Sequence, residues 1–150
     1  MANTFTSLTY HIIFGTKNRE PWIDTAIESR IWSFLGGIVR ENGMRPLQIG
    51  GRPDHIHLLI AIPATIAISK AVQYIKGGPS KWIKAEFSGK QGFAWQDGYG
   101  AFTVSKSNAA EVTAYIQNQR EHHRAKTFQE EYVAFLQRHE IEYDERYLWD

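Results

Sequence analysis

Two histidines with spacing suited to metal binding stand at the start of an apolar stretch, HIHLLIAI, in which His55 and His57 flank Ile56. Side chains alternate along a β-strand, so both imidazole rings would lie on one face of the strand, roughly 6.5 Å apart. Two imidazoles at this separation can converge on one divalent cation. They can equally be polar residues at a sheet edge, so a metal site requires a further ligand from elsewhere in the chain.

A second group of polar side chains, in YIQNQREHH, has helical spacing. Tyr115 and Gln119 are four residues apart and share one face of a helix predicted over residues 109–125, beside an aliphatic stripe. This polar edge exceeds what a core helix requires, although a half-buried tyrosine that only packs is the alternative. Two residues one turn further are expected to be solvated rather than to bind a metal: His122 and His123.

The composition excludes several kinds of site. The chain has 150 residues and no cysteine, which excludes a disulfide scaffold, a thiolate zinc site and a cysteine nucleophile. The helical zinc-protease motif is absent, and Leu59 and Ile60 stand where a metallo-β-lactamase-type signature would have an aspartate and a histidine. Residues 1–10 lack a signal-peptide pattern and no apolar run is long enough to span a bilayer, so we expect a cytoplasmic protein.

Charge is unevenly distributed along a chain whose net charge is +1. Residues 1–119 carry 12 Lys and Arg against 8 Asp and Glu, whereas residues 120–150 carry 5 against 8. The excess of positive charge in residues 1–119 favours a polyanionic partner. Strong non-specific binding to duplex DNA is not predicted, because such affinity requires many phosphates to be neutralised at once. A solvated basic helix face is the alternative interpretation.

The elements that must position these residues follow from hydrophobic periodicity and turn signals. One domain is expected, with a kink or break at Gly77-Gly78-Pro79 and with Asn108 and Glu111 capping the third helix. The order β-α-β-β-α-β predicts an α+β, ferredoxin-like antiparallel sheet with added C-terminal helices. Two helices would cover one face of the sheet, and the other face would remain open as a site. The predicted segments are a strand over 6–15, a helix over 24–41, a hairpin over 44–51 and 55–62, a helix over 66–87, a strand over 99–105, and helices over 109–125 and 128–138.

Taken together, four segments resemble the HUH-type single-tyrosine transposases of small bacterial insertion sequences and their repeat-associated relatives. The segments are SLTYHIIFGTKNRE, PDHIHLLIAI, WQDGYGAFTVS and YIQNQREHH, which together span most of residues 7–125. A His-x-His pair alone is a weak signal, but a Tyr-x-x-x-Gln helix downstream of it makes the resemblance specific. The resemblance implies a single domain over residues 1–150, in which residues 127–150 form a C-terminal extension.

The resemblance also implies a chemistry. Tyr115 would attack a phosphodiester of single-stranded DNA at hairpin-bearing element ends, forming a 5′-phosphotyrosine link and a free 3′-OH. A divalent ion, Mg or Mn, would be held by His55, His57 and Gln119 and would assist at the phosphate. Relatives work as homodimers whose sites are completed in trans, although a monomer stays open. Candidate contacts to DNA phosphates are Lys17, Arg19, Arg52, Lys76, Lys81 and Lys84.

Two other functions remain open at this point. The first is a domesticated relative that binds hairpin nucleic acid without cutting it. The second is a small metal-dependent phosphoesterase that uses water in place of Tyr115. A covalent adduct between the protein and an oligonucleotide would separate the transposase hypothesis from both alternatives.

Overall fold

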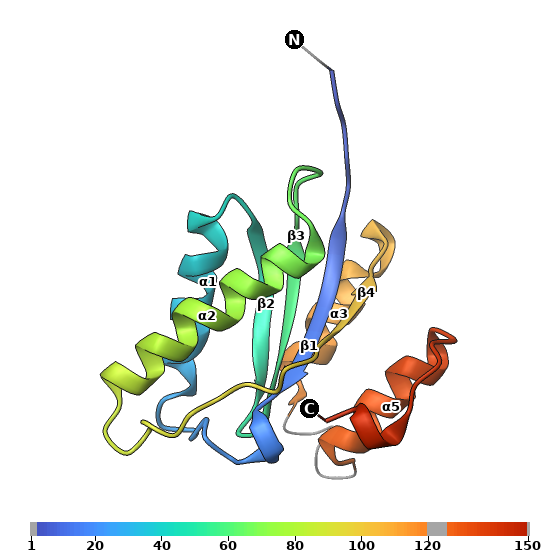
Figure 1. Cartoon of the computed structure of the whole chain (residues 1–150). Helices are drawn as coiled ribbons and strands as arrows, with labels where there is room; N and C mark the ends of the chain where they lie inside the picture. The colour runs from blue at the N-terminus through green and yellow to red at the C-terminus, as the bar shows by residue number, and fades with distance from the viewer. Residues whose placement is uncertain (1–2, 120–125, 150) are drawn as a thin grey trace.

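A four-stranded antiparallel sheet forms the centre of the molecule (Figure 1). The computed structural model describes residues 3–119 and 126–149. The strand order is β2-β3-β1-β4, with β1 and β3 in the middle. This is the strand order of a ferredoxin-like fold, so the predicted fold class is confirmed. The strands are β1 (Thr9–Gly15), β2 (Arg45–Arg52), β3 (His55–Ala61) and β4 (Gly100–Thr103).

Two helices, α1 (Glu28–Glu41) and α2 (Ile68–Glu86), cover one face of this sheet (Figure 1). Alternate side chains of β1 and β3 point toward them and form the first core. The core extends to the buried residues of both helices, such as Leu35 and Ile75. Helix α1 begins at Glu28, four residues later than its apolar periodicity predicts. Side chains at Ile12, Phe14, Ile56, Leu58 and Ile60 are fully buried in this core.

Of the kink or break predicted at Gly77-Gly78-Pro79, the break is wrong, because α2 continues through Pro79. Proline removes one helical hydrogen bond and crowds the preceding turn, which costs about 3 kcal/mol in a helix interior. Val72, Ile75 and Ile83 lie on both sides of the proline and are buried in the first core. Tertiary packing of these side chains therefore outweighs the local preference for a break.

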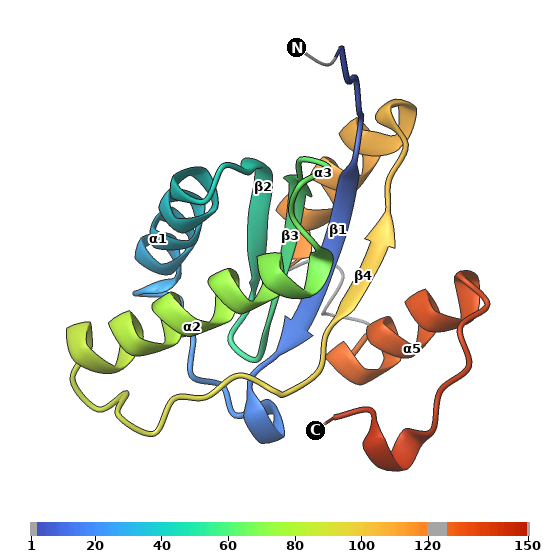
Figure 2. The same ribbon diagram turned by 45° about the horizontal axis from the view of Figure 1, so that its top comes forward.

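The other face of the sheet is covered rather than open, which corrects a second prediction (Figure 2). Helix α3 (Ala109–Gln117) lies over β2 and β3. Helix α5 (Phe128–Arg138) lies over the β1 and β4 side and forms the second core. The second core exists because β1 and β4 carry apolar residues on this face too, and these need cover. It consists of Ile13, Phe102, Phe128, Tyr132 and Leu136.

The ends of the C-terminal helices differ in how well the sequence predicts them. Helix α3 begins after Asn108 as expected, but Asn108 makes no side-chain cap hydrogen bond, because residues 106–108 already form a 3-10 turn. This helix ends at Gln117, and the rest of the predicted span over 120–125 lies outside the described residues. Helix α5 has the predicted bounds. Within the described ranges, none of the helices is long and apolar enough to cross a membrane.

Candidate active site

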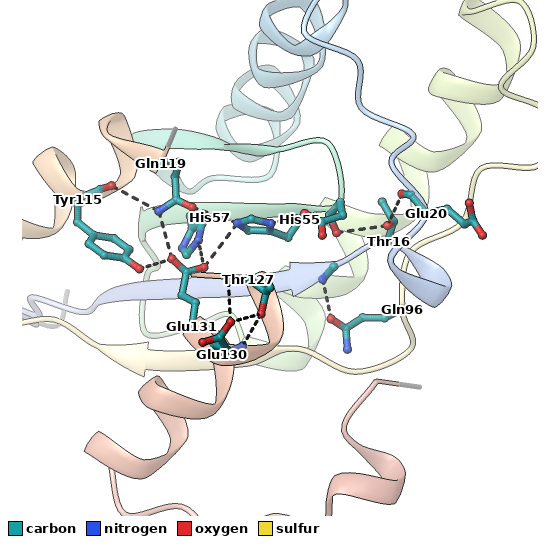
Figure 3. A network of polar contacts seen from close by, with 12 residues as sticks. Thr16, Glu20, His55, His57, Gln96, Tyr115, Gln119, Thr127, Glu130 and Glu131 are labelled. Carbon is teal, nitrogen blue, oxygen red and sulfur yellow. Dashed lines mark hydrogen bonds and ion pairs between the residues drawn. The ribbon is translucent and has the colours of Figure 1, made fainter. Parts of the chain in front are cut away.

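His55 and His57 lie on the same face of β3, as alternation predicts, and they point away from the first core (Figure 3). Both side chains are 0% exposed, because α3 and α5 cover them. Their ring centroids are 5.2 Å apart. The ring of Phe128 in α5 stacks on His55 at 4.4 Å. The pair is therefore a buried feature of the fold rather than a polar sheet edge.

Helix α3 and the residues just after it bring Tyr115 and Gln119 beside these histidines (Figure 3), so the structure joins the two groups of polar residues that the sequence singles out. Gln119 follows the end of α3 and places its Oε1 atom 3.0 Å from Nε2 of His55. The ring of Tyr115 lies 5.7 Å from that of His57, centroid to centroid. Within the single chain, these four side chains lie together at one site.

A glycine in β2 permits the close approach of α3 to the sheet. A Cβ atom at Gly50 would lie 3.0 Å from Cγ2 of Ile116 and 3.1 Å from the backbone oxygen of the same residue. Ile116 adjoins Tyr115 and is the buried residue of α3. The absence of a side chain at Gly50 thus sets how near Tyr115 lies to the histidines.

We expect Gly50→Ala to push α3 away from β2, because the carbonyl oxygen of Ile116 belongs to rigid helix backbone. Overpacking of this kind costs about 1–3 kcal/mol of the free energy of unfolding. Thermal or urea denaturation measures it. Gly37→Ala in α1 is the matched control, since a Cβ there meets nothing within 4 Å. Equal stability of the two variants would show that the contact does not determine the position of α3.

Glu131 of α5 is a site residue that the sequence analysis missed. Its carboxylate is 3% exposed and reaches both sides of the site. Oε1 lies 3.0 Å from Nε2 of His57 and 3.5 Å from Nε2 of His55. Oε2 accepts a hydrogen bond from the hydroxyl of Tyr115 and lies 3.5 Å from Nε2 of Gln119. Glu131 falls on the apolar stripe of its helix, together with Phe128 and Tyr132, and a carboxylate in that position is the signal that could have identified it.

His11 of β1 is a second missed residue. Its Nε2 atom lies 2.8 Å from Nδ1 of His57, on the side of that ring opposite Glu131. Burial, together with the neighbouring His57, lowers the pKa of His11 to about 3. His11 is therefore a neutral partner that orients the ring of His57 through the nitrogen that does not face the site.

The hydrogen-bond inventory of His55 indicates where a cation fits. Nδ1 of His55 lies 2.7 Å from Oδ1 of Asp54, and since a carboxylate only accepts, this nitrogen carries a proton. In the neutral ring, Nε2 then offers a lone pair toward Oε1 of Gln119 and Oε1 of Glu131, which are also acceptors. These atoms lie close enough together to share one ion, so the side chains fit a divalent cation.

Tyr115 is protonated in this arrangement. Burial raises the pKa of its hydroxyl, and the carboxylate of Glu131 raises it further. A phenol in this state is a poor nucleophile unless a cation or a base assists it. The pKa of the Tyr115 hydroxyl thus depends on the charge of Glu131.

Two of the predicted DNA contacts lie near the histidines. Arg52 ends β2 and pairs with His55 in the sheet register. Arg19 and Arg52 line a cleft of about 510 Å³ at the start of α5, together with Asp54 and Lys126. The Nη1 atom of Arg52 is buried and has no hydrogen-bond partner among the described residues. Lys17 is exposed, two residues before Arg19.

The other three predicted contacts lie on α2, on the opposite side of the sheet (Figure 1). Lys81 and Lys84 are exposed. Lys76 is half-buried, and burial lowers its pKa to about 8. Its ammonium group donates hydrogen bonds to three backbone oxygens of residues 96–98, at 2.6, 3.0 and 2.8 Å. Lys76 thus holds the loop before β4.

Comparison with known proteins places the chain among transposases. A family model described as "Transposase IS200 like" matches residues 4–119. The ISDra2 transposase TnpA of Deinococcus radiodurans is 28% identical over 119 residues, which cover 75% of this chain and 84% of that protein. The transposase for insertion sequence element IS200 of Salmonella typhimurium is 29% identical over 126 residues, which cover 81% of this chain and 82% of that protein.

Solved structures give the same result for the fold. A crystal structure of a Deinococcus radiodurans protein described as a transposase has a TM-score of 0.66 at 27% identity, covering 79% of this chain and 95% of that one. The structure of a REP-associated tyrosine transposase bound to a REP hairpin has a TM-score of 0.58 at 13% identity. The match covers 82% of this chain and 73% of that one. The region matched by the family model contains the histidines, Tyr115 and Gln119. It ends before α5 and Glu131.

Proposed function

The chain belongs to the IS200-like transposase family, and on that premise we propose that it cuts and rejoins single-stranded DNA at hairpin-bearing ends through a 5′-phosphotyrosine intermediate. The family implies DNA cutting and strand transfer in general terms. The finer proposal is carried by one observation. Tyr115, Gln119 and two buried imidazoles, from segments more than 50 residues apart in sequence, converge on one point.

Tyr115 is the proposed nucleophile. Its hydroxyl oxygen attacks phosphorus and forms a tyrosyl–phosphate ester, while the bond from phosphorus to the 3′ oxygen breaks. The phenol loses its proton and the leaving oxygen gains one, so that a free 3′-OH results. Because the ester keeps the energy of the phosphodiester, a second 3′-OH can attack it and rejoin strands without ATP.

We propose that His55, His57 and Gln119 hold a divalent ion, Mg²⁺ or Mn²⁺, as the converging acceptor atoms of His55 and Gln119 support. When bound, such an ion withdraws charge from the phosphate and stabilises the transition state. His11 keeps His57 in place through Nδ1, and Asp54 does the same for His55. These partners fix which ring nitrogen faces the ion.

Access of DNA requires a movement, because both histidines are fully buried. Helix α3, which lies over β2 and β3, has one buried residue, Ile116, whereas α5 contributes several buried residues to the second core. We propose that α3 is the element that moves. Arg19 and Arg52 then contact backbone phosphates near the cleavage point, with Lys17 beside them, which the unpartnered Nη1 atom of Arg52 supports. Lys81 and Lys84 are proposed to contact only DNA that extends beyond the active site.

A covalent adduct tests this function. The chain is incubated with a labelled single-stranded oligonucleotide that carries a hairpin and with Mn²⁺, and then separated under denaturing conditions. A band of protein shifted by attached DNA is the expected result. Hairpin binding without an adduct would instead indicate a non-cleaving nucleic-acid-binding protein, and cleavage without an adduct would indicate a phosphoesterase that uses water.

We further propose that the active form is a homodimer whose sites are completed in trans. In the single chain, α3 lies over β2 at the sheet edge, where the same helix of a second subunit can replace it. Mixing inactive Tyr115→Phe with inactive His57→Ala is then expected to restore part of the cleavage, up to about one intact site per mixed dimer. Labelled-DNA cleavage measures the rescue. Subunit exchange without rescue would mean that the cis arrangement is the active one.

A further inference from the structure

We propose that Glu131 is a ligand of the metal ion, so that the C-terminal extension completes the metal site. This inference rests on the proposed function and deepens it, since the ligand set expected from the family consists of His55, His57 and Gln119. Among the described residues, His55, His57 and Glu131 form a group whose ligand atoms all lie within 4.8 Å of one another. The family model ends at residue 119, so Glu131 belongs to a segment it does not reach.

The spacing of the acceptor atoms matches that of a coordination shell. Nitrogen and oxygen ligands of divalent ions such as Mg²⁺ lie about 2.0–2.2 Å from the metal, so neighbouring ligands at right angles are about 3 Å apart. The edge from His57 Nε2 to Glu131 Oε1 is 3.0 Å and that from His55 Nε2 to Gln119 Oε1 is also 3.0 Å. The edge from His55 Nε2 to Glu131 Oε1 is 3.5 Å. A small ion therefore fits among these atoms with little rearrangement.

The charge of Glu131 favours the same conclusion. A buried carboxylate is costly unless a positive charge compensates it. A divalent cation shared with the two imidazoles is a group that can supply such a charge. One carboxylate oxygen beside the imidazole nitrogens and the amide oxygen also adds a charged hard donor, which suits Mg²⁺ and Mn²⁺ better than the imidazoles and amide alone do.

The two oxygens of Glu131 have different partners, which couples the ion to the nucleophile. Oε1 faces the two histidines, while Oε2 accepts the hydrogen bond from Tyr115. Glu131 therefore positions the tyrosine hydroxyl relative to the ion. Because α5 is anchored in the second core through Phe128, Tyr132 and Leu136, the carboxylate stays with the histidines when α3 moves.

Mn²⁺ binding to the full chain tests this inference without any DNA. The loss of the free-ion electron paramagnetic resonance signal gives the Kd. We expect Glu131→Gln, which keeps the shape of the side chain but removes its charge, to weaken binding by at least ~10-fold, as His57→Ala does. Glu130→Gln is the matched control, because Glu130 is the preceding residue of α5, is exposed and retains a capping-box side chain. Its Kd should equal that of the unmodified chain.

The outcomes separate the inference from the function on which it rests. If His57→Ala weakens Mn²⁺ binding and Glu131→Gln does not, Glu131 is no ligand and the proposed function stands. If the unmodified chain binds no Mn²⁺, the metal-dependent function fails instead. If Glu131→Gln does not fold, the infrared difference spectrum of the unmodified chain with and without Mn²⁺ replaces the variant. Mn²⁺ is expected to shift a carboxylate band, and a spectrum with no such shift overturns the inference.

Discussion

Tyr115→Phe is expected to abolish covalent attachment to single-stranded hairpin DNA while leaving DNA binding largely intact. The substitution removes the one oxygen that forms the bond to phosphorus and keeps the aromatic ring that lies beside His57. Adduct formation should fall below detection, because no other group of residue 115 can accept the phosphoryl group. Denaturing electrophoresis measures the adduct, and fluorescence anisotropy of labelled DNA measures binding.

Tyr132→Phe is the matched control for this experiment. Tyr132 lies in α5, next to Glu131, and is buried in the second core, where burial raises its pKa to about 12. Its hydroxyl lies beside Gly100 of β4, whereas the Tyr115 hydroxyl donates to Glu131. The control should form the adduct at the rate of the unmodified chain. Undiminished adduct in Tyr115→Phe, or loss of the adduct in Tyr132→Phe alone, would contradict the assignment of the nucleophile.

His57→Ala is expected to lower divalent-ion affinity and DNA cleavage together. It removes one imidazole ligand and leaves both Glu131 and His11 without their common partner, so the loss should reach at least ~10–100-fold. Partial recovery at high Mn²⁺ should follow, because His55 and Gln119 still converge. Mn²⁺ titration and a cleavage time course at increasing metal concentration measure the two effects.

Two controls accompany this variant. His139→Ala replaces an exposed histidine after the end of α5 and should change neither quantity. The melting temperature of His57→Ala, measured in EDTA, reports the loss in the free energy of unfolding that results when the imidazole is removed. This loss is about 1–3 kcal/mol for each buried polar group left unpaired. Cleavage by the unmodified chain that persists in EDTA would exclude a metal role altogether.

Hydrophobic periodicity predicted most of the elements because each buries a face whose spacing is visible in the sequence. The hairpin, the fold class and the bounds of α5 are confirmed. Local rules failed where tertiary packing opposed them. Pro79 favours a kink or a break, yet the buried residues on both sides of it keep α2 continuous. The sheet face expected to be open is covered, because the apolar residues of β1 and β4 that point to it need cover.

The sequence by itself determined which residues could do the chemistry, since strand alternation places His55 and His57 on one face and helical spacing pairs Tyr115 with Gln119. It could not determine that Glu131 and His11 meet them. Glu131 is 74 residues from His57 along the chain, and His11 is 46 residues away. Contacts over such separations depend on how the strands pair and how α5 docks, which no local pattern specifies. Only the tertiary structure therefore decided that the site is buried and that a carboxylate lies between the histidines and the tyrosine.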